Sequence, residues 1–333
     1  MDRAKLFKIA TRLIPAWFIF WIIASLIKYP YFFANFLANG IARGAIYALI
    51  AFGFGLIYNV TGVLNLAHGE VFMIGAVTST TIFIKVLHAT EPNLRNWIWF
   101  FVILMFSMAL GAFVSLLVEK LVFKRLRQAN KIAPIIASLG IALILQNLGI
   151  FINGSGKHKF NTIFPQFPGF IDLATALQRA AIVLVFAVPF LWLFAYLTTR
   201  SKNGLAIEAV AQNPDQAKLV GIDINKTIAR TFVFAGAAAG LAGILYAQTY
   251  RMTNYSLGME IGLISYAAAV IGGISSIRGT IFGGFLVGII VSLSDGLPSG
   301  LGYRWSETAI YSIFILMLVY KPQGLLGYEK ENV

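Results

Sequence analysis

The sequence predicts an all-α protein that crosses a membrane many times. Hydrophobic residues make up 59% of its 333 residues, charged residues only 12%, and the mean hydropathy is +0.80, far from the values of a soluble domain. A span needs about 20 largely apolar residues to cross roughly 30 Å of hydrocarbon. The length therefore allows about eight to ten spans, and we expect residues 1–333 to form a single transmembrane domain.

Apolar runs separated by polar or helix-breaking residues locate ten candidate spans. The run 260–274 is too short to cross comfortably, and 58–66 is polar enough to be irregular backbone at the membrane edge. We expect re-entrant segments in both places, packed in protein or lining a wet cavity. No internal repeat is visible, but transporters often hide an inverted repeat, and we expect one here. The ten candidate spans are residues 10–28, 34–57, 67–87, 97–119, 132–152, 179–199, 229–249, 260–274, 280–296 and 307–320.

Lysine and arginine predict the orientation. With the N-terminus inside, the inner segments carry roughly twice as many basic residues as the outer ones, which fits the positive-inside rule and places both termini in the cytoplasm. A cleaved signal peptide is the competing interpretation of the N-terminus, but no small-x-small pattern closes its apolar run, and Trp17 and Trp21 are bulky. The net charge of +13 lies in short segments between spans, so it indicates topology rather than nucleic-acid binding.

The 31 glycines predict close helix packing. Many have small-xxx-small spacing, which lets helix backbones approach where lipid offers no hydrophobic drive for association. In residues 270–284, glycines on both sides of a short basic turn predict a sharp helix hairpin; its Gly272 and Gly273 are candidate gate residues. The spaced pairs are Gly40 with Gly44, Gly236 with Gly240, Gly279 with Gly283, and Gly284 with Gly288.

The stretch NLAHGE (65–70) places His68 and Glu70 at the start of a predicted span. A zinc deaminase would pair H-x-E with P-C-x-x-C, but the chain has no cysteine. Residues two apart on a helix also point in different directions, so we predict no metal site. Glu70 suits a first helical turn, and Asn65 could cap that turn. A gate role and proton chemistry are the alternatives.

Arg43 lies within the predicted span 34–57. A buried arginine costs several kcal/mol in hydrocarbon unless it meets a partner or water. A pair with a carboxylate from another helix and contact with substrate are both open. Together with Asn65, His68 and Glu70, Arg43 is a candidate residue of the translocation pathway.

The longest predicted inner loop, residues 200–230, contains the pattern of a short helix. Asn213 can cap it, Pro214 suits its first position, Asp215 complements the helix dipole, and Gly221 can end it in a left-handed turn. A helix about 10 Å long is marginal alone. We expect it to dock on a cytoplasmic partner or on its own membrane domain.

Enzymatic patterns are not discernible. The phosphate-binding pattern G-x-x-x-x-G-K-[ST] does not occur, so ATP hydrolysis would need another chain, and no serine-histidine-carboxylate arrangement is visible. We expect a transport subunit without a catalytic residue or a cofactor of its own.

Four segments together resemble the permease subunits of branched-chain amino acid ABC importers. They are YNVTGVLNLAHGEVFMIGAV (58–77), AVAQNPDQAKLVGI (209–222), ISYAAAVIGGISSIRGTIFGG (264–284) and YKPQGLLG (320–327). The NLAHGE form is similar to the first of the two permease types in this family. The resemblance implies a bacterial inner-membrane complex of two different permeases, two ATPases that bind ATP and Mg, and a periplasmic substrate-binding protein.

The resemblance also implies that the inner-loop helix couples ATPase closure to the membrane helices. The sequence departs from the wider EAA pattern of ABC importers, because Glu208-Ala209-Val210 is followed by Gly221 at a longer spacing than usual. The candidate coupling residues are Glu208, Pro214, Asp215, Ala217, Leu219 and Gly221.

Several functions stay open at this point. Family members carry branched-chain amino acids, other neutral amino acids, or urea and short amides. Arg43, His68 and Glu70 would also suit an ion-coupled secondary transporter, and a passive channel would need neither energy source.

Overall fold

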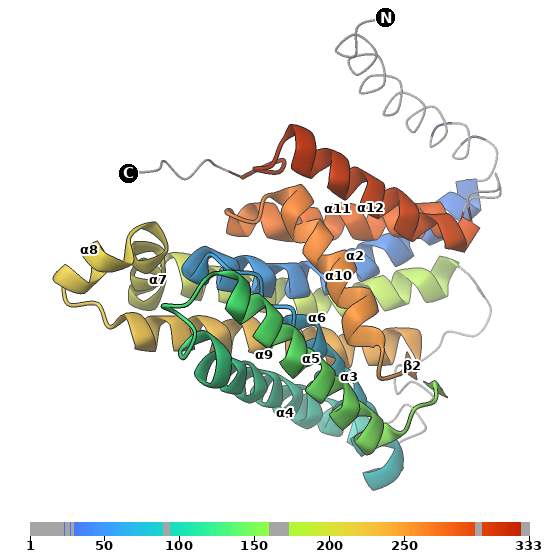
Figure 1. The fold of residues 1–333 in the computed structure, drawn as a ribbon. Helices are drawn as coiled ribbons and strands as arrows, with labels where there is room; N and C mark the ends of the chain where they lie inside the picture. The colour runs from blue at the N-terminus through green and yellow to red at the C-terminus, as the bar shows by residue number, and fades with distance from the viewer. Residues whose placement is uncertain are drawn as a thin grey trace, which may run out of the picture.

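The computed structural model describes residues 30–88, 94–159, 173–296 and 302–327, together with residues 23 and 27. Within these ranges the chain is a bundle of long helices (Figure 1), and seven helical stretches are long and apolar enough to cross a membrane. The prediction of an all-α, multi-span protein is therefore confirmed. The candidate span 10–28 lies outside the described residues, except for residue 23 and residue 27, and stays a prediction.

The other nine candidate spans coincide with helices. The inner loop holds two helices, α7 and α8, rather than the one expected. Two short strands, β1 (His158–Lys159) and β2 (Met252–Thr253), pair antiparallel, with His158 opposite Thr253. The helices are α2 (Pro30–Thr61), α3 (His68–Thr81), α4 (Leu94–Val118), α5 (Ile132–Asn153), α6 (Leu173–Thr199), α7 (Lys202–Gln212), α8 (Pro214–Leu219), α9 (Ile224–Tyr250), α10 (Leu257–Gly272), α11 (Ile277–Gly296) and α12 (Gly302–Tyr320); π-helical turns extend α3 over Ile82–Val86 and α4 over Glu119–Phe123.

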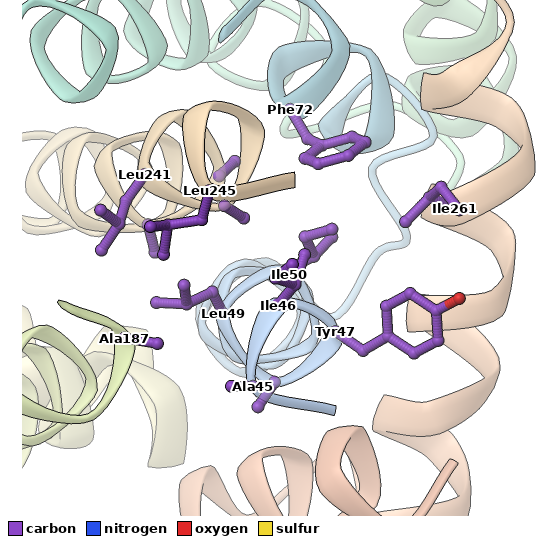
Figure 2. Packing of buried hydrophobic residues seen from close by; sticks show 14 of the residues in the cluster. Ala45, Ile46, Tyr47, Leu49, Ile50, Phe72, Ala187, Leu241, Leu245 and Ile261 are labelled. Carbon is purple, nitrogen blue, oxygen red and sulfur yellow. The ribbon is translucent and has the colours of Figure 1, made fainter. Parts of the chain in front are cut away.

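α2 is the central helix of the bundle. Residues 44–57 of α2 are apolar all round and all buried, which is the pattern of a helix segment that is covered on every face. Figure 2 shows Ile46, Leu49 and Ile50 of α2 surrounded by side chains of the neighbouring helices, among them Phe72 of α3 and Leu245 of α9. These residues are all buried, so α2 connects the helices on its opposite sides.

The predicted glycine contacts are present. A Cβ atom added to Gly288 of α11 would overlap the backbone of Gly44 in α2, and one added to Gly240 of α9 would overlap the carbonyl of Ser107 in α4. The backbones of these helices therefore touch directly. Such contacts replace the hydrophobic drive that lipid cannot supply.

The two halves of the bundle follow one plan in opposite directions. α2 packs on α11, as α9 packs on α4, and each long helix is followed by a non-helical stretch and a short helix, α3 or α10. α2 and α9 are antiparallel, because Gly53 faces Ala235 while Arg43 reaches Tyr250. α2–α5 and α9–α12 thus form the inverted repeat that we expected.

The predicted hairpin at residues 270–284 is also present. α10 ends at Gly272, Gly273 has φ +115°, and α11 begins at Ile277. The C-terminal segment packs on this turn, where the N–H groups of Leu325 and Leu326 donate to carbonyls at the end of α10, each at 2.9 Å.

Replacement of Gly240 by alanine should destabilise the protein, because the added methyl group would press on the Ser107 carbonyl. Overpacking of this kind costs about 1–3 kcal/mol. Gly140→Ala in α5 is the matched control, since nothing lies within 4 Å of its added methyl group. We expect a lower melting temperature in detergent for Gly240→Ala and an unchanged or raised one for Gly140→Ala. Equal melting temperatures would contradict the close α4–α9 contact.

Candidate functional site

α3 begins inside the bundle rather than at its edge. The ring of His68 lies against Gly53 of α2, and Gly53 precedes the end of α2 at Thr61 by eight residues (61 − 53), or about 12 Å. The N–H of Leu66 donates to Ser138 Oγ of α5 at 3.1 Å. The stretch 62–67 therefore turns back into the bundle. The predicted irregular backbone is confirmed for residues 62–66, whereas residues 58–61 belong to α2.

Asn65 shapes the turn before α3 but does not cap the helix. Its Oδ1 accepts a hydrogen bond from the N–H of Ala67 at 3.1 Å, and Ala67 itself occupies the N-cap position without a side-chain cap. The N-cap position lies two residues after Asn65, so the predicted capping role of Asn65 is wrong. The side chain instead holds the reversal that lets α3 start at depth.

Glu70 stands in the first turn of α3, as predicted. Its side chain is buried and lies against Gly258 in the first turn of α10, where an added Cβ would sit 2.8 Å from Oε1 and closer still to Oε2. The neighbouring Gly69 lies against the Gly258 carbonyl and against Gly262. One buried carboxyl group therefore lies beside the N-terminal ends of two helices, α3 and α10.

The contact between α3 and α10 has a signal in the sequence that the predictions missed. Asn65 precedes Gly69 by four residues, and Asn254 precedes Gly258 by four. The two asparagines occupy the same place in the two repeats, and both are buried. An N-x-x-x-G pattern before each short helix would have pointed to the inverted repeat.

Arg43 is paired with a carboxylate from another helix, one of the two roles left open. Its Nη1 donates to Asp295 Oδ2 of α11 at 2.6 Å, and its Nε donates to the hydroxyl of Tyr250 in α9 at 3.2 Å. The guanidinium carbon also lies 5.6 Å from the centre of the Tyr250 ring. The sequence alone does not identify Asp295 as the partner, because it lies near the end of its predicted span, where solvation of a charge costs little. A role of Arg43 in the translocation pathway stays a prediction.

The candidate gate residues do not form one cluster. Gly272 and Gly273 pack on Gly279 and on the C-terminal segment, at the end of α10 opposite Gly258, whereas Glu70 lies at its start. Among the described residues, no three His, Cys, Asp or Glu side chains are grouped so that they could hold a metal ion.

The predicted inner-loop helix is α8, which projects with α7 at the end of the bundle opposite β2 (Figure 1). Asn213 Oδ1 accepts hydrogen bonds from the N–H groups of Asp215 and Gln216, both at 3.1 Å. Gly221 ends the segment with φ +84°. The predicted cap and terminator are both confirmed.

The candidate coupling residues point in different directions. Ala217 is 3% exposed and packs against its own domain, whereas Leu219 is 87% and Val220 75% exposed. Exposed leucine and valine at a helix tip are the side chains available for a partner. The remaining candidates are exposed: Glu208, Pro214, Asp215 and Gly221.

α7 connects this tip to the membrane helices. Ser201 caps α7 by accepting from the N–H of Gly204 at 3.1 Å, and Gly204 lies against the backbone of Thr198 in α6. Arg230 of α9 donates to Asn203 Oδ1 at 2.8 Å. The tip is therefore attached to both α6 and α9.

Asp223 caps α9 by accepting a hydrogen bond from the N–H of Lys226 at 3.0 Å. This hydrogen bond lowers the pKa of the Asp223 carboxyl. The cap is therefore charged at neutral pH, and its contribution to stability decreases as the pH falls through the lowered value.

A bundle of spanning helices with an inverted repeat, and with a capped helix exposed at one end, defines a membrane transport protein. The family model for the permease component of branched-chain amino acid transport systems matches residues 36–320. The chain belongs to this family and is a multi-pass permease subunit of an ABC importer. Such permeases work with ATPase and substrate-binding partners.

Individual relatives match almost the whole chain. It is 31% identical to the high-affinity branched-chain amino acid permease BraD of Pseudomonas aeruginosa, over 89% of this chain and 96% of BraD. It is 29% identical to LivH of Escherichia coli, over 89% and 96%, and 30% identical to a probable LivH of Methanocaldococcus jannaschii, over 88% and 92%. No solved structure matches the chain.

The contact between Glu70 and Gly258 can be tested with a pair of variants. Gly258→Ala should lower the melting temperature, because its methyl group would overlap the confined carboxylate. Glu70→Ala removes that carboxylate, so the double variant should lose less stability than the sum of the two single ones, with a coupling of about 0.5–3 kcal/mol. Additive losses in thermal unfolding would show that the two residues do not touch.

Proposed function

We propose that this chain is the first permease of an ATP-driven importer for branched-chain or other neutral amino acids. The observation that carries the proposal is the similarity to BraD along 89% of the chain. Its partners would be a second, homologous permease, two ATPases that bind ATP and Mg, and a periplasmic substrate-binding protein. The complex would lie in a bacterial inner membrane, with both termini of this chain in the cytoplasm.

The outward face of α5 supports a second membrane subunit. Gly140 is exposed there with nothing within 4 Å of an added Cβ, and Asn147 presents a polar side chain on the same face. Small residues and polar side chains on a membrane helix favour contact with another helix over contact with lipid.

The exposed tip of α8 supports coupling to an ATPase. Leu219 and Val220 would enter an apolar groove on the ATPase, and Ala217 would fix the helix to the membrane domain. Movement of the tip would reach α6 through Gly204 and α9 through Arg230. The Asn213 cap would keep this short helix folded while its tip moves.

Two other transport functions have weaker support. Import of urea or short amides would use the same architecture, and the ligand of the binding protein would reveal it. An ion-coupled secondary transporter was suggested by Arg43, His68 and Glu70, but the charge of Arg43 is neutralised by Asp295. Uptake that fails when the ion gradient collapses, with ATP still present, would favour that alternative.

Leu219→Asp should uncouple ATP hydrolysis from uptake, because a carboxylate cannot enter an apolar groove without losing its hydration. The measurement is leucine uptake and ATPase activity in proteoliposomes that contain the complete complex. We expect uptake to fall at least about tenfold, a loss of about 1.4 kcal/mol of coupling, while the melting temperature of the exposed variant is unchanged.

Lys218→Ala is the matched control, since Lys218 is an exposed neighbour on the same helix and its loss should leave uptake close to that of the unaltered protein. Normal uptake by Leu219→Asp would move the docking site away from α8. Uptake by this chain alone, without ATP or partners, would contradict the importer proposal itself.

A further inference from the structure

We propose that a groove between α4 and α9 binds one anionic phospholipid, with its phosphate at Lys226 and Arg230 and an acyl chain along the apolar wall. The groove has a volume of about 280 Å³. It lies near the start of α9, at the end of the bundle where α7 and α8 project (Figure 1). The proposal uses only the membrane location of the chain, so it does not depend on which substrate is imported. The lining residues are Leu116, Lys226, Ala229, Arg230, Val233 and Phe234.

The first argument is the order of side chains along α9. The groove residues of α9 follow one another at intervals of three or four or lie next to each other, which places them on one face of the helix. Lys226 comes two residues after the start of α9 at Ile224. Phe234 lies eight residues further on (234 − 226), or about 12 Å deeper along the axis. The basic side chains thus precede the apolar ones, which is the order of head and tail in a phospholipid.

The second argument is the surface into which the groove opens. Leu116 forms the α4 side of the groove, and Phe113 and Leu117, close to it on α4, are 58% and 39% exposed. Leu116 and Phe234 are themselves half-buried. An apolar face that is uncovered among the described residues, on a helix long enough to span, is a face that hydrocarbon can contact. The groove therefore opens beside lipid rather than into the interior of the bundle.

The third argument is that the charge of Arg230 is not neutralised by a carboxylate within the part of the chain that the structure describes. Arg230 Nη1 donates to the neutral amide oxygen of Asn203 at 2.8 Å, which leaves further N–H groups of the guanidinium for an anion. Lys226 Nζ lies 3.3 Å from Asp223 Oδ2, but the two side chains are 74% and 46% exposed. A pair this exposed holds its partners weakly, so Lys226 can turn to a phosphate.

The fourth argument decides between possible occupants. A membrane helix of a partner subunit would bring apolar side chains to this level and leave Arg230 without a counter-charge. A free phosphate ion would satisfy Arg230 and leave the apolar wall beside Phe234 empty. An anionic phospholipid supplies both parts, and basic pockets between membrane helices on the cytoplasmic side are sites at which anionic head groups bind.

The test is native mass spectrometry of the full-length chain in detergent, measured both alone and with the subunits that copurify with it. The probes are dioleoyl phosphatidylglycerol, which is anionic, and dioleoyl phosphatidylethanolamine, which has the same chains and no net charge. Each basic residue at such a surface changes affinity about fivefold, so the anionic lipid should bind at least about tenfold more tightly. A large excess of inorganic phosphate should not displace it.

Four variants locate the binding. Lys226→Gln together with Arg230→Gln should remove the preference for phosphatidylglycerol, whereas Arg230→Lys keeps the charge and should retain most of it. Ala229→Leu narrows the groove without changing its charge and should weaken binding of both lipids. Asn203→Ala is the matched control, because it removes the hydrogen bond to Arg230 and leaves the charge, so lipid binding should be unchanged. Thermal unfolding of each variant confirms that it is folded.

Four outcomes would overturn the proposal. Equal affinity for the two lipids, or unchanged phosphatidylglycerol binding by the double glutamine variant, would show that Lys226 and Arg230 do not bind the head group. Displacement by inorganic phosphate would indicate a site for a free anion. Binding by the chain alone that is absent when the other subunits are present would show that a partner subunit occupies the groove.

Discussion

Direct backbone contact at glycine is the interaction on which the rest of the structure depends. Lipid is as apolar as leucine, so helices in a membrane associate through close packing rather than through the hydrophobic effect. Here that packing occurs where α2 meets α11 at Gly44 and Gly288, and where α9 meets α4 at Gly240. Both contacts join a helix of one repeat to a helix of the other, so close packing at glycine holds the two halves of the bundle together.

The same constraint explains the stretch NLAHGE. Gly69 lets α3 touch α10, Asn65 holds the reversal that brings α3 to this depth, and Glu70 places its carboxyl group beside the N-terminal ends of both short helices. The side chains of His68 and Glu70 contact different neighbours, since His68 lies against Gly53 and Glu70 against Gly258. His68 packs edge to face on Phe54 at 4.8 Å between ring centres and fills the space that Gly53 leaves.

The sequence predicted what is local and missed what depends on distant contacts. Apolar runs located nine helices, and Asn213, Pro214 and Gly221 predicted α8, because spans and caps are encoded within a few residues. The depth of His68 and the partner of Arg43 depend on how the stretch 62–67 and the end of α11 fold back, which no local pattern records. The inverted repeat is hard to see in the sequence because few residues recur at matching positions of the two halves, among them Asn65 and Gly69, which correspond to Asn254 and Gly258.

The central claim is that each half of the bundle contains a helix that begins inside it after a non-helical stretch. A cysteine pair at Gly149 and Tyr255 tests this directly, because a Cβ on Gly149 in α5 would lie 3.8 Å from the Tyr255 Cβ, just before α10, the usual separation in a disulfide. The same Cβ would lie 2.8 Å from Met73 Sδ, so the flexible Met73 side chain has to move aside. The chain has no cysteine of its own, so any cross-link belongs to the introduced pair. The structure predicts nearly complete disulfide formation in membranes under mild oxidation, read as a shift in gel mobility that a reductant reverses. If no cross-link forms while both thiols are present and the variant still assembles, the stretch before α10 does not enter the bundle and the account is wrong.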